Sequence, residues 1–417
     1  MSSGAHPRYP DPLIPLVPLA SLDLTPADEL VCPPIPLTVD GWSPLVLGCA
    51  TFGWGIYAPQ AVTKEELSLP LRTVRLAFKY GIRVVDTSPH YHPSEIVLGN
   101  CLRALRDEYP RNTYKVVTKC GQYSSDGFDY SPENIERSVR RSLDRLGCEY
   151  LDIVYLHDVE FIADKLPGLQ KPNRPKEAFS YTQVAQSMGL APEDQGKILG
   201  EGDAKVLKAF EVLGRLKEEG LIKEIGICGY PLPILLRLSY LIRAHSSYEL
   251  TTILSYSHSN LANDAFSSYL PHFPSSVRLL TASPLNMGLL SSQGPPAWHP
   301  ACSNPANAGL AEAARQAGKL AGELWSARGG AVDLALGFGL RNLNGLNGEK
   351  VPVLVGAKNQ EEIHQAVRVW SEVNATGANT GNEGEGDGSR IEAERKVREV
   401  FIKTGWEDLS WESPGKK

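Results

Sequence analysis

The sequence predicts an α/β protein built as a (β/α)8 barrel, the TIM-barrel fold, with a proline-rich N-terminal arm and two insertions. Short apolar runs alternate with helical patterns from about Pro44 onward, and this alternation indicates repeated βα units around a parallel sheet. Eight strand-like runs are present, and eight repeats close more naturally into a barrel than into an open sheet. Periodicity alone leaves a doubly wound open sheet as the alternative.

The proline-rich arm covers residues 1–43. Nine prolines fall within residues 1–36, so neither a helix nor a central strand can persist there, and we expect an extended segment on the surface. The barrel follows over residues 44–373, and its strands are predicted at 45–50, 82–87, 114–119, 151–156, 223–228, 251–256, 277–282 and 351–356.

Helices are predicted after most strands, and the clearest one lies in SPENIERSVRRSLDRLG, residues 131–147. Ser131 suits the N-cap, Pro132 suits the first helical position, and Gly147 supplies a stop. The apolar side chains of this segment fall on one face, which predicts an amphipathic helix against the barrel: Ile135, Val139, Leu143 and Leu146.

Two insertions interrupt the repeat. The first covers residues 158–203. The second covers residues 374–390 and contains NATGANTGNEGEGDGS, which is too polar and glycine-rich to pack, so we expect a disordered surface loop there. A C-terminal helix and tail are predicted over residues 391–417.

Composition excludes several function classes. The chain has 417 residues and a net charge of −6, with no lysine or arginine block of the kind that neutralises a phosphate backbone, so nucleic acid is an unfavourable partner. No run of about 18 apolar residues is present, which argues against a membrane span. The seven cysteines are scattered without C-x-x-C spacing, and this pattern favours a reducing, cytoplasmic compartment. The oligomeric state stays open.

Four polar residues occupy the ends of predicted strands or the loops that follow them: Asp86, Tyr91, Lys119 and His157. In a parallel barrel the active site gathers at the C-terminal ends of the strands. An isolated tyrosine has a pKa of about 10 and transfers protons poorly at neutral pH. A lysine beside it stabilises the phenolate, an aspartate holds the lysine, and a neutral histidine can bond the substrate oxygen. The set suits proton transfer to a carbonyl oxygen while a hydride reaches its carbon.

Two other interpretations of these residues remain open. A strand-end aspartate often caps a turn, and a strand-end lysine often extends its charge to solvent, so each residue alone is weak evidence. A metal site is the second alternative, because Asp86, His90, His92 and His157 could supply three or four ligands. The spacing argues against metal, since the two loop histidines are not at i and i+4 on one helix.

Three motifs resemble those of the aldo-keto reductase superfamily, over roughly residues 44–373. GIRVVDTSPHY resembles its Asp and Tyr motif, VVTKCG its Lys motif, and DIVYLHD its His motif. The resemblance implies that Asp86, Tyr91, Lys119 and His157 form the catalytic tetrad of the superfamily. ILSYSHSNL at 253–261 and SPLNMGLLSSQGPPAWHPA at 283–301 are similar to the branch that contains L-galactose dehydrogenase and fungal NAD-dependent D-arabinose 1-dehydrogenase.

This branch implies oxidation of the anomeric hydroxyl of a free aldose to its lactone, with NAD as cofactor and NADP as a possible substitute. The substrate would be an aldose of the D-arabinose or L-galactose type, and we expect Trp54, Trp298 and His299 to line its pocket. The WHP turn could instead be purely structural. The alternatives are a general NADP-dependent aldehyde or ketone reductase, and a cofactor-binding interaction subunit without catalysis.

The resemblance also implies a set of cofactor contacts, namely Ala50, Thr51, Ser255, Ser283, Leu285, Gly356, Ala357, Lys358 and Glu362. Glu362 aligns where NADP-preferring members usually carry a basic residue, so its carboxylate would repel a 2′-phosphate and could accept a hydrogen bond from the 2′-hydroxyl of NAD. A simple helix cap formed with Asn359 would equally explain Glu362. Two departures alter the expected cofactor contacts: Cys228–Gly229 replaces a common Ser-Asn pair, and Ala282 replaces a stacking tyrosine.

Overall fold

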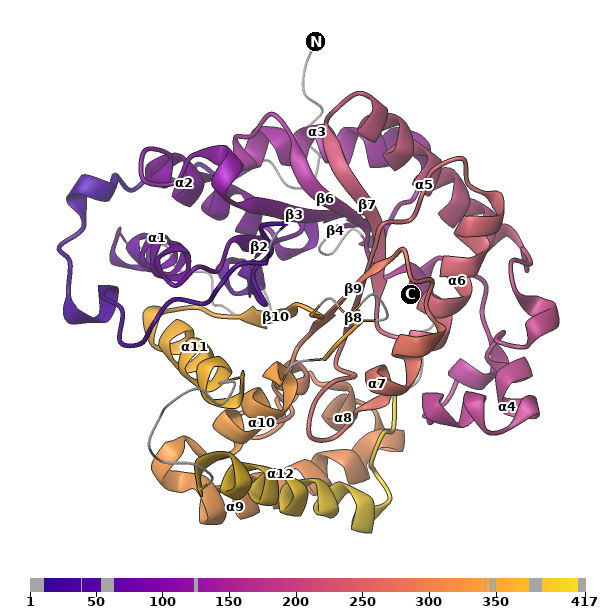
Figure 1. Ribbon diagram of the computed structural model, residues 1–417. Coiled ribbons are helices and arrows are strands. Elements are labelled where there is room, and N and C mark those ends of the chain that lie inside the picture. Colours follow the sequence, from indigo (N-terminus) through magenta and orange to yellow (C-terminus); the bar gives the residue numbers. More distant parts are fainter. Residues whose placement is uncertain are drawn as a thin grey trace.

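The strands form a closed barrel of eight parallel strands, in the order β1-β10-β9-β8-β7-β6-β3-β2 (Figure 1). The computed structural model describes residues 11–38, 40–53, 64–123, 127–341, 343–345, 348, 350–374 and 385–411. Closure confirms the barrel and excludes the doubly wound sheet. All eight predicted strands are present: β1 Leu45–Gly48, β2 Val84–Asp86, β3 Lys115–Cys120, β6 Leu151–Leu156, β7 Ile222–Gly229, β8 Thr252–Tyr256, β9 Arg278–Ala282 and β10 Val353–Gly356.

Helices surround the barrel in Figure 1. They are α1 Lys64–Lys79, α2 Ser94–Leu105, α3 Pro132–Leu146, α4 Thr182–Ser187, α5 Glu201–Glu218, α6 Leu232–His245, α7 Ala265–Tyr269, α8 Pro300–Ser303, α9 Ala308–Trp325, α10 Gly330–Leu340, α11 Gln360–Asn374 and α12 Glu385–Thr404. The short strands β4 Gln122–Tyr123 and β5 Gly127–Phe128 pair as a hairpin after β3. In the described part of the chain, no helix has the length and apolar character needed to cross a bilayer.

Helix α3 shows how the sequence pattern becomes packing. Ser131 precedes the helix and Pro132 is its first residue, as predicted, although the Ser131 side chain makes no capping hydrogen bond. Gly147 ends the helix with φ 66°, a left-handed conformation that glycine adopts without steric cost. The apolar face of α3 is buried against the barrel, which fixes the loop that leads from β3 to it.

Apolar side chains fill the barrel interior because alternate residues of each strand point inward. The inward cluster contains Val46, Val84, Val117, Ile153, Leu254 and Leu280, all buried. A larger apolar layer lies between the strands and the surrounding helices. The barrel interior is therefore filled mainly by apolar side chains.

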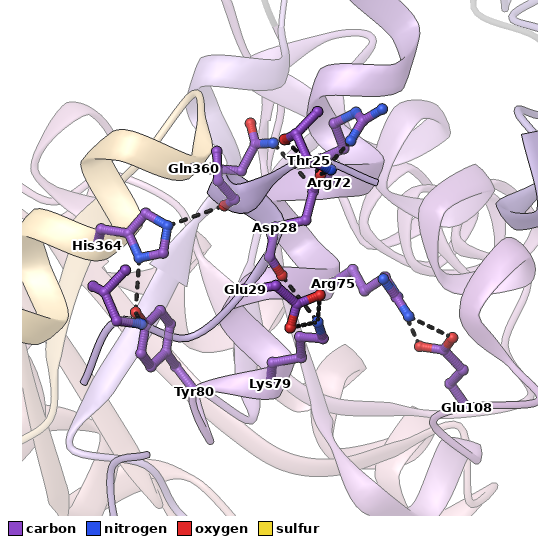
Figure 2. A network of polar contacts seen from close by, with 12 residues as sticks. Thr25, Asp28, Glu29, Arg72, Arg75, Lys79, Tyr80, Glu108, Gln360 and His364 are labelled. Atoms are coloured by element: carbon purple, nitrogen blue, oxygen red, sulfur yellow. Dashed lines mark hydrogen bonds and ion pairs between the residues drawn. The ribbon is translucent and has the colours of Figure 1, made fainter. Parts of the chain in front are cut away.

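The N-terminal arm is held to the outside of the barrel by polar contacts, shown in Figure 2. The carboxylate of Asp28 receives hydrogen bonds from Arg72 of α1 (2.5 Å) and from Gln360 of α11 (3.1 Å). His364 of α11 bonds the Ala27 carbonyl with one ring nitrogen (3.0 Å) and the Tyr80 hydroxyl with the other (2.7 Å). The arm therefore bridges α1 and α11, two helices that flank the start and the end of the barrel sequence.

The insertion at 158–203 lies at the side of the barrel, with α4 at the periphery in Figure 1. Its end is fixed by Asp203, which is fully buried and receives two hydrogen bonds from Arg237 of α6, at 2.7 and 2.8 Å. The backbone amides of Leu199 and Asp164 donate to the same carboxylate. The insertion is therefore tied to the helical layer by a buried ion pair.

The C-terminal helix α12 begins at Glu385, so the helix starts earlier than the predicted boundary at residue 391, and residues 385–390 belong to it rather than to the loop. Residues 375–384 of the predicted loop lie outside the described residues. Arg390 of α12 is buried and bonds both Asp333 of α10 and Glu372 of α11. This ion network ties the first part of α12 to α10 and α11.

Candidate active site

The C-terminal ends of β2 and β3 bring Asp86 and Lys119 together. The two strands are neighbours in the barrel, with Asp86 in register with Val117. Lys119 Nζ donates to Asp86 Oδ1 at 2.5 Å and to the Thr87 carbonyl at 3.0 Å. Both side chains are almost wholly buried. Burial raises the pKa of Asp86, and the Lys119 ammonium offsets this only in part.

Tyr91 lies in the 3₁₀ turn Pro89–Tyr91 that follows β2, and Lys119 Nζ is 5.0 Å from the centroid of its ring. The charge of Lys119 lowers the pKa of the Tyr91 phenol, as the sequence argument expected. Burial raises that pKa by more, so the pKa lies above its ordinary value. The phenol is therefore protonated at neutral pH when the site holds no ligand, which suits a proton donor to a carbonyl oxygen.

His157 directly follows β6 and completes the quartet. Its ring centroid is 5.7 Å from that of Tyr91, and its Nδ1 is 3.0 Å from the hydroxyl oxygen of Ser88. Burial lowers the pKa of His157 well below its usual range, helped by the nearby Lys119 charge, so the imidazole is neutral. Asp158 Oδ1 lies 3.9 Å from Nε2, which favours a proton on Nε2 and a hydrogen bond from the Ser88 hydroxyl to Nδ1.

Two carboxyl groups that the sequence argument did not select follow His157 in the chain. Asp158 is largely buried, and Glu160 is almost wholly buried and accepts a hydrogen bond from the Tyr230 amide (3.0 Å). An added Cβ on Gly229 would lie 2.2 Å from Glu160 Oε2, so Glu160 fills the space that a side chain at 229 would need. A side chain at position 229 would therefore require the Glu160 carboxylate to move. The sequence signal that could have identified Asp158 and Glu160 is the acidic pair in LHDVEF, directly after a predicted strand.

The predicted cofactor contacts lie mainly where β10 meets α11. Gly356 and Lys358 are exposed, Ala357 is buried, and the Thr51 hydroxyl donates to the Ala357 carbonyl (2.9 Å). Ala50 and Leu285 are partly exposed, as is Ser283, whose φ is 60°. An exposed glycine beside the N-terminus of a 15-residue helix provides backbone donors for a pyrophosphate, so these residues fit a nicotinamide dinucleotide.

Ser255 differs from the other predicted cofactor contacts. It is fully buried, and its hydroxyl lies 3.4 Å from Nδ1 of His258, so the structure gives it a partner inside the protein. Tyr256, the next residue, is the register partner of Ala282 across β8 and β9 and is partly exposed. The aromatic ring of Tyr256 is therefore available beside Ala282. It comes from β8, whereas the family resemblance places the stacking tyrosine at position 282 on β9.

Glu362 acts in local capping. The Asn359 side chain accepts a hydrogen bond from the Glu362 amide (2.9 Å), which is the N-cap contact that the spacing indicated. The Glu362 carboxylate accepts from the Lys358 amide (2.9 Å) and forms an ion pair with Lys358 Nζ (3.4 Å). The carboxylate remains partly exposed at the N-terminus of α11, so capping does not prevent it from meeting a ligand.

The three residues predicted to contact substrate differ in their position and exposure. Trp54 lies outside the described residues, and Trp298 is partly exposed on the loop after β9. His299 is fully buried: its Nδ1 accepts from the Ala301 amide (3.0 Å), and its Nε2 lies 3.1 Å from the Asn286 carbonyl. His299 therefore caps α8, and both of its ring nitrogens have backbone partners. Its ring packs edge-on against Trp411, 5.2 Å away.

The metal alternative lacks a ligand set. Within the described ranges, no three His, Cys, Asp or Glu side chains are grouped closely enough to share a metal ion. The ring of His90 lies 5.7 Å from that of His157, whereas His92 lies within electrostatic reach of Arg145 of α3 and Asp11 of the N-terminal arm. The loop after β2 therefore divides its histidines between the barrel mouth and the outer helices.

Comparison with known proteins agrees with this geometry. Residues 44–376 match the model of the Aldo/keto reductase family. D-arabinose 1-dehydrogenase of Saccharomyces cerevisiae is 33% identical over 348 residues, covering 82% of this chain and 87% of the relative. L-galactose dehydrogenase of Arabidopsis thaliana is 34% identical over 310 residues, covering 73% of this chain and 79% of the relative. A solved glycerol dehydrogenase from Gluconobacter oxydans superposes with a TM-score of 0.53 at 20% identity, covering 91% and 97% of the two chains, which supports the barrel fold.

Proposed function

The chain belongs to the aldo/keto reductase family and is an NAD(P)-dependent oxidoreductase, and from that premise we propose that it oxidises the anomeric hydroxyl of a free aldose to a lactone. The observation that carries this proposal is the similarity, over most of the chain, to two enzymes named as dehydrogenases of D-arabinose and L-galactose. The two sugars differ, so the proposal names the class of aldose rather than one substrate.

The buried quartet supports a proton-transfer role. In the oxidation, the anomeric C–H bond breaks as its hydride leaves, the hydroxyl proton passes to the Tyr91 oxygen, and the carbonyl of the lactone forms. A nicotinamide cofactor would supply the hydride acceptor, held by residues 356–358 and α11. His157 would donate its Nε2–H to the substrate oxygen and hold it near Tyr91. Lys119, fixed by Asp86, favours the phenolate that must accept the proton.

The quartet also argues against the alternative of a cofactor-binding interaction subunit without catalysis. Lys119 and Asp86 form a buried ion pair beside a neutral histidine, and such an arrangement costs stability that a binding module has no reason to retain. A general NADP-dependent reductase is the remaining alternative, because the same quartet serves carbonyl reduction.

For the cofactor we propose a preference for NAD. The support is Glu362, a partly exposed carboxylate in the first turn of α11, where a 2′-phosphate would meet negative charge. Lys358 stands beside it and is largely exposed, but its ammonium is paired with Glu362 at 3.4 Å, which reduces its availability to a phosphate.

A substrate panel tests the proposal. Purified protein should be assayed with NAD and with NADP on D-arabinose, L-galactose and other free aldoses, and in the reverse direction on aromatic aldehydes and ketosteroids. We expect turnover of aldoses. Activity confined to the aromatic aldehydes or ketosteroids would refute sugar oxidation and favour the general reductase.

A further inference from the structure

Asp158 is a carboxyl group in the barrel mouth that the quartet does not use. It directly follows His157 at the C-terminal end of β6, and its Oδ1 lies 3.9 Å from His157 Nε2. That nitrogen is the one left to face a substrate, because Nδ1 is bonded to Ser88. The Asp158 side chain keeps 13% of its surface exposed, compared with 5% for His157. A substrate oxygen bound to His157 would therefore lie next to this carboxyl group.

Local hydrogen bonding does not account for a carboxylate at this position. Asp158 precedes the 3₁₀ turn Val159–Phe161 in the N-cap position, but its side chain makes no capping hydrogen bond. Its φ is 50°, in the left-handed region, which aspartate and asparagine adopt more readily than other non-glycine residues, so the backbone by itself does not require a carboxylate. It receives a hydrogen bond from the Gln122 side chain. A carboxylate can accept about four hydrogen bonds, so most of its capacity is still available.

The surroundings of Asp158 bring the pKa of its carboxyl group close to neutral pH. Burial raises the pKa of Asp158 to about 7, against the opposing charge of Lys119. The other titratable groups that influence it, or that it influences, come from several elements around the mouth: Tyr91, Tyr130, His157, Glu160, Cys228 and Tyr256. Lys119 is the cation among these groups, and its ammonium already bonds Asp86. A ligand that donates hydrogen bonds would therefore stabilise Asp158 as a carboxylate.

We propose that Asp158 determines substrate specificity by accepting hydrogen bonds from hydroxyl groups next to the reacting carbon, which selects polyhydroxylated substrates over simple aldehydes. The inference rests on the proposed sugar oxidation and assigns it a specificity residue. A substrate without hydroxyl groups would leave the carboxyl desolvated and without a donor, and sites of this kind reject such substrates strongly.

Two aldehydes with the same carbon skeleton test the proposal. Glyceraldehyde carries two hydroxyl groups, and propanal carries none. We compare kcat/KM for reduction of both by the wild type and by Asp158→Asn, which tolerates the left-handed backbone and removes the charge. Cofactor Kd is measured in parallel by protein fluorescence. Glu160→Gln is the matched control, because Glu160 is a neighbouring carboxyl that is only 1% exposed and bonds the Tyr230 amide.

Asp158→Asn should lower kcat/KM for glyceraldehyde by about tenfold to a hundredfold, mainly through KM, which corresponds to the loss of a hydrogen bond to a charged group. Propanal reduction should change by less than about threefold, and cofactor Kd should stay the same. Glu160→Gln should not alter the ratio between the two aldehydes. If Asp158→Asn does not fold, Asp158→Gly suits the same positive φ and makes the same prediction.

Equal losses on both aldehydes, or none on glyceraldehyde, would overturn the role of Asp158. These outcomes are separable from the fate of the proposed function. If no free aldose is oxidised but Asp158→Asn still discriminates between the two aldehydes, sugar oxidation fails and the specificity role stands. If aldoses are oxidised and the aldehyde ratio is unchanged, the specificity role fails alone.

Discussion

Two buried carboxylates bonded to a cation show how differently this molecule uses the same chemistry. Asp203 holds the end of the insertion to α6 and accepts four hydrogen bonds, two from Arg237 and two from backbone amides. Burial raises its pKa, but these donors outweigh burial, and the pKa lies below its ordinary value. Asp86 in the barrel mouth accepts one from Lys119, and its pKa is raised by burial.

The difference separates groups that stabilise the fold from groups that serve the site. A carboxylate with four donors is held in its charged form and fixes one geometry. A carboxyl with few donors keeps its capacity for a ligand, and the fold accepts the cost of burying it. Asp158 has a raised pKa as Asp86 does, and both lie at the same end of the barrel.

The largest effect is expected where the structural ion pair is broken. Arg237→Met leaves Asp203 as a buried carboxylate without its cation, and this should lower the free energy of unfolding by about 3–5 kcal/mol. Arg140→Met is the control, because Arg140 forms its ion pairs on the surface and should change stability by about 1 kcal/mol or less. Urea denaturation measures both. A cost for Arg237→Met no larger than that of the control would contradict the structural role.

The second prediction concerns Asp158, whose ionisation should destabilise the fold, whereas the ion pair of Asp203 stabilises it. Its folded pKa of about 7 lies above the ordinary 3.8, so ionisation costs stability progressively as pH rises between these values. Asp158→Asn removes this cost and should raise the free energy of unfolding at pH 8 by up to about 4 kcal/mol, with little change near pH 4. Denaturation of the wild type and the variant at both pH values tests this prediction. A destabilised variant at pH 8 would place Asp158 with Asp203, among the structural carboxylates.

The third prediction removes the proton-transfer group. Tyr91→Phe should slow turnover by roughly a hundredfold or more, the usual scale of a lost acid–base group, while cofactor binding stays largely intact. Because the pKa of Tyr91 is raised by burial, wild-type oxidation should accelerate as pH rises through the alkaline range, and Tyr91→Phe should lose this rise. Rates measured across pH in both proteins check it. Near-normal turnover in the variant would remove Tyr91 from the mechanism.

The smallest predicted effect concerns the cofactor. Wild type should use NAD over NADP by at least about tenfold in kcat/KM, or 1.4 kcal/mol, and Glu362→Arg should narrow or reverse this ratio. Glu361→Arg is a suitable control, because it adds the same charge in the same turn at an exposed position. Equal use of both cofactors by the wild type would show that Glu362 is only a cap.

The strands and the quartet could be predicted because each depends on local signals. Eight apolar runs set the barrel, and the polar residues at the ends of three of them identify Asp86, Lys119 and His157. The sequence could not show that Glu160 fills the space beside Gly229, because that contact joins the insertion to the end of β7. The backbone partners of His299 could not be predicted for a similar reason. A loop histidine suggests a polar contact, but whether its nitrogens meet substrate or backbone depends on how residues 286–301 fold back.

The proposed function depends most directly on what the barrel mouth does to a free aldose. The decisive measurement is product analysis: purified protein is incubated with NAD and an aldose from the panel, and NADH and lactone are quantified together, the lactone by trapping with hydroxylamine. We predict one lactone for each NADH formed, at a rate that collapses in Tyr91→Phe. No lactone from any aldose, in a preparation that still reduces simple aldehydes, would contradict aldose oxidation by this protein.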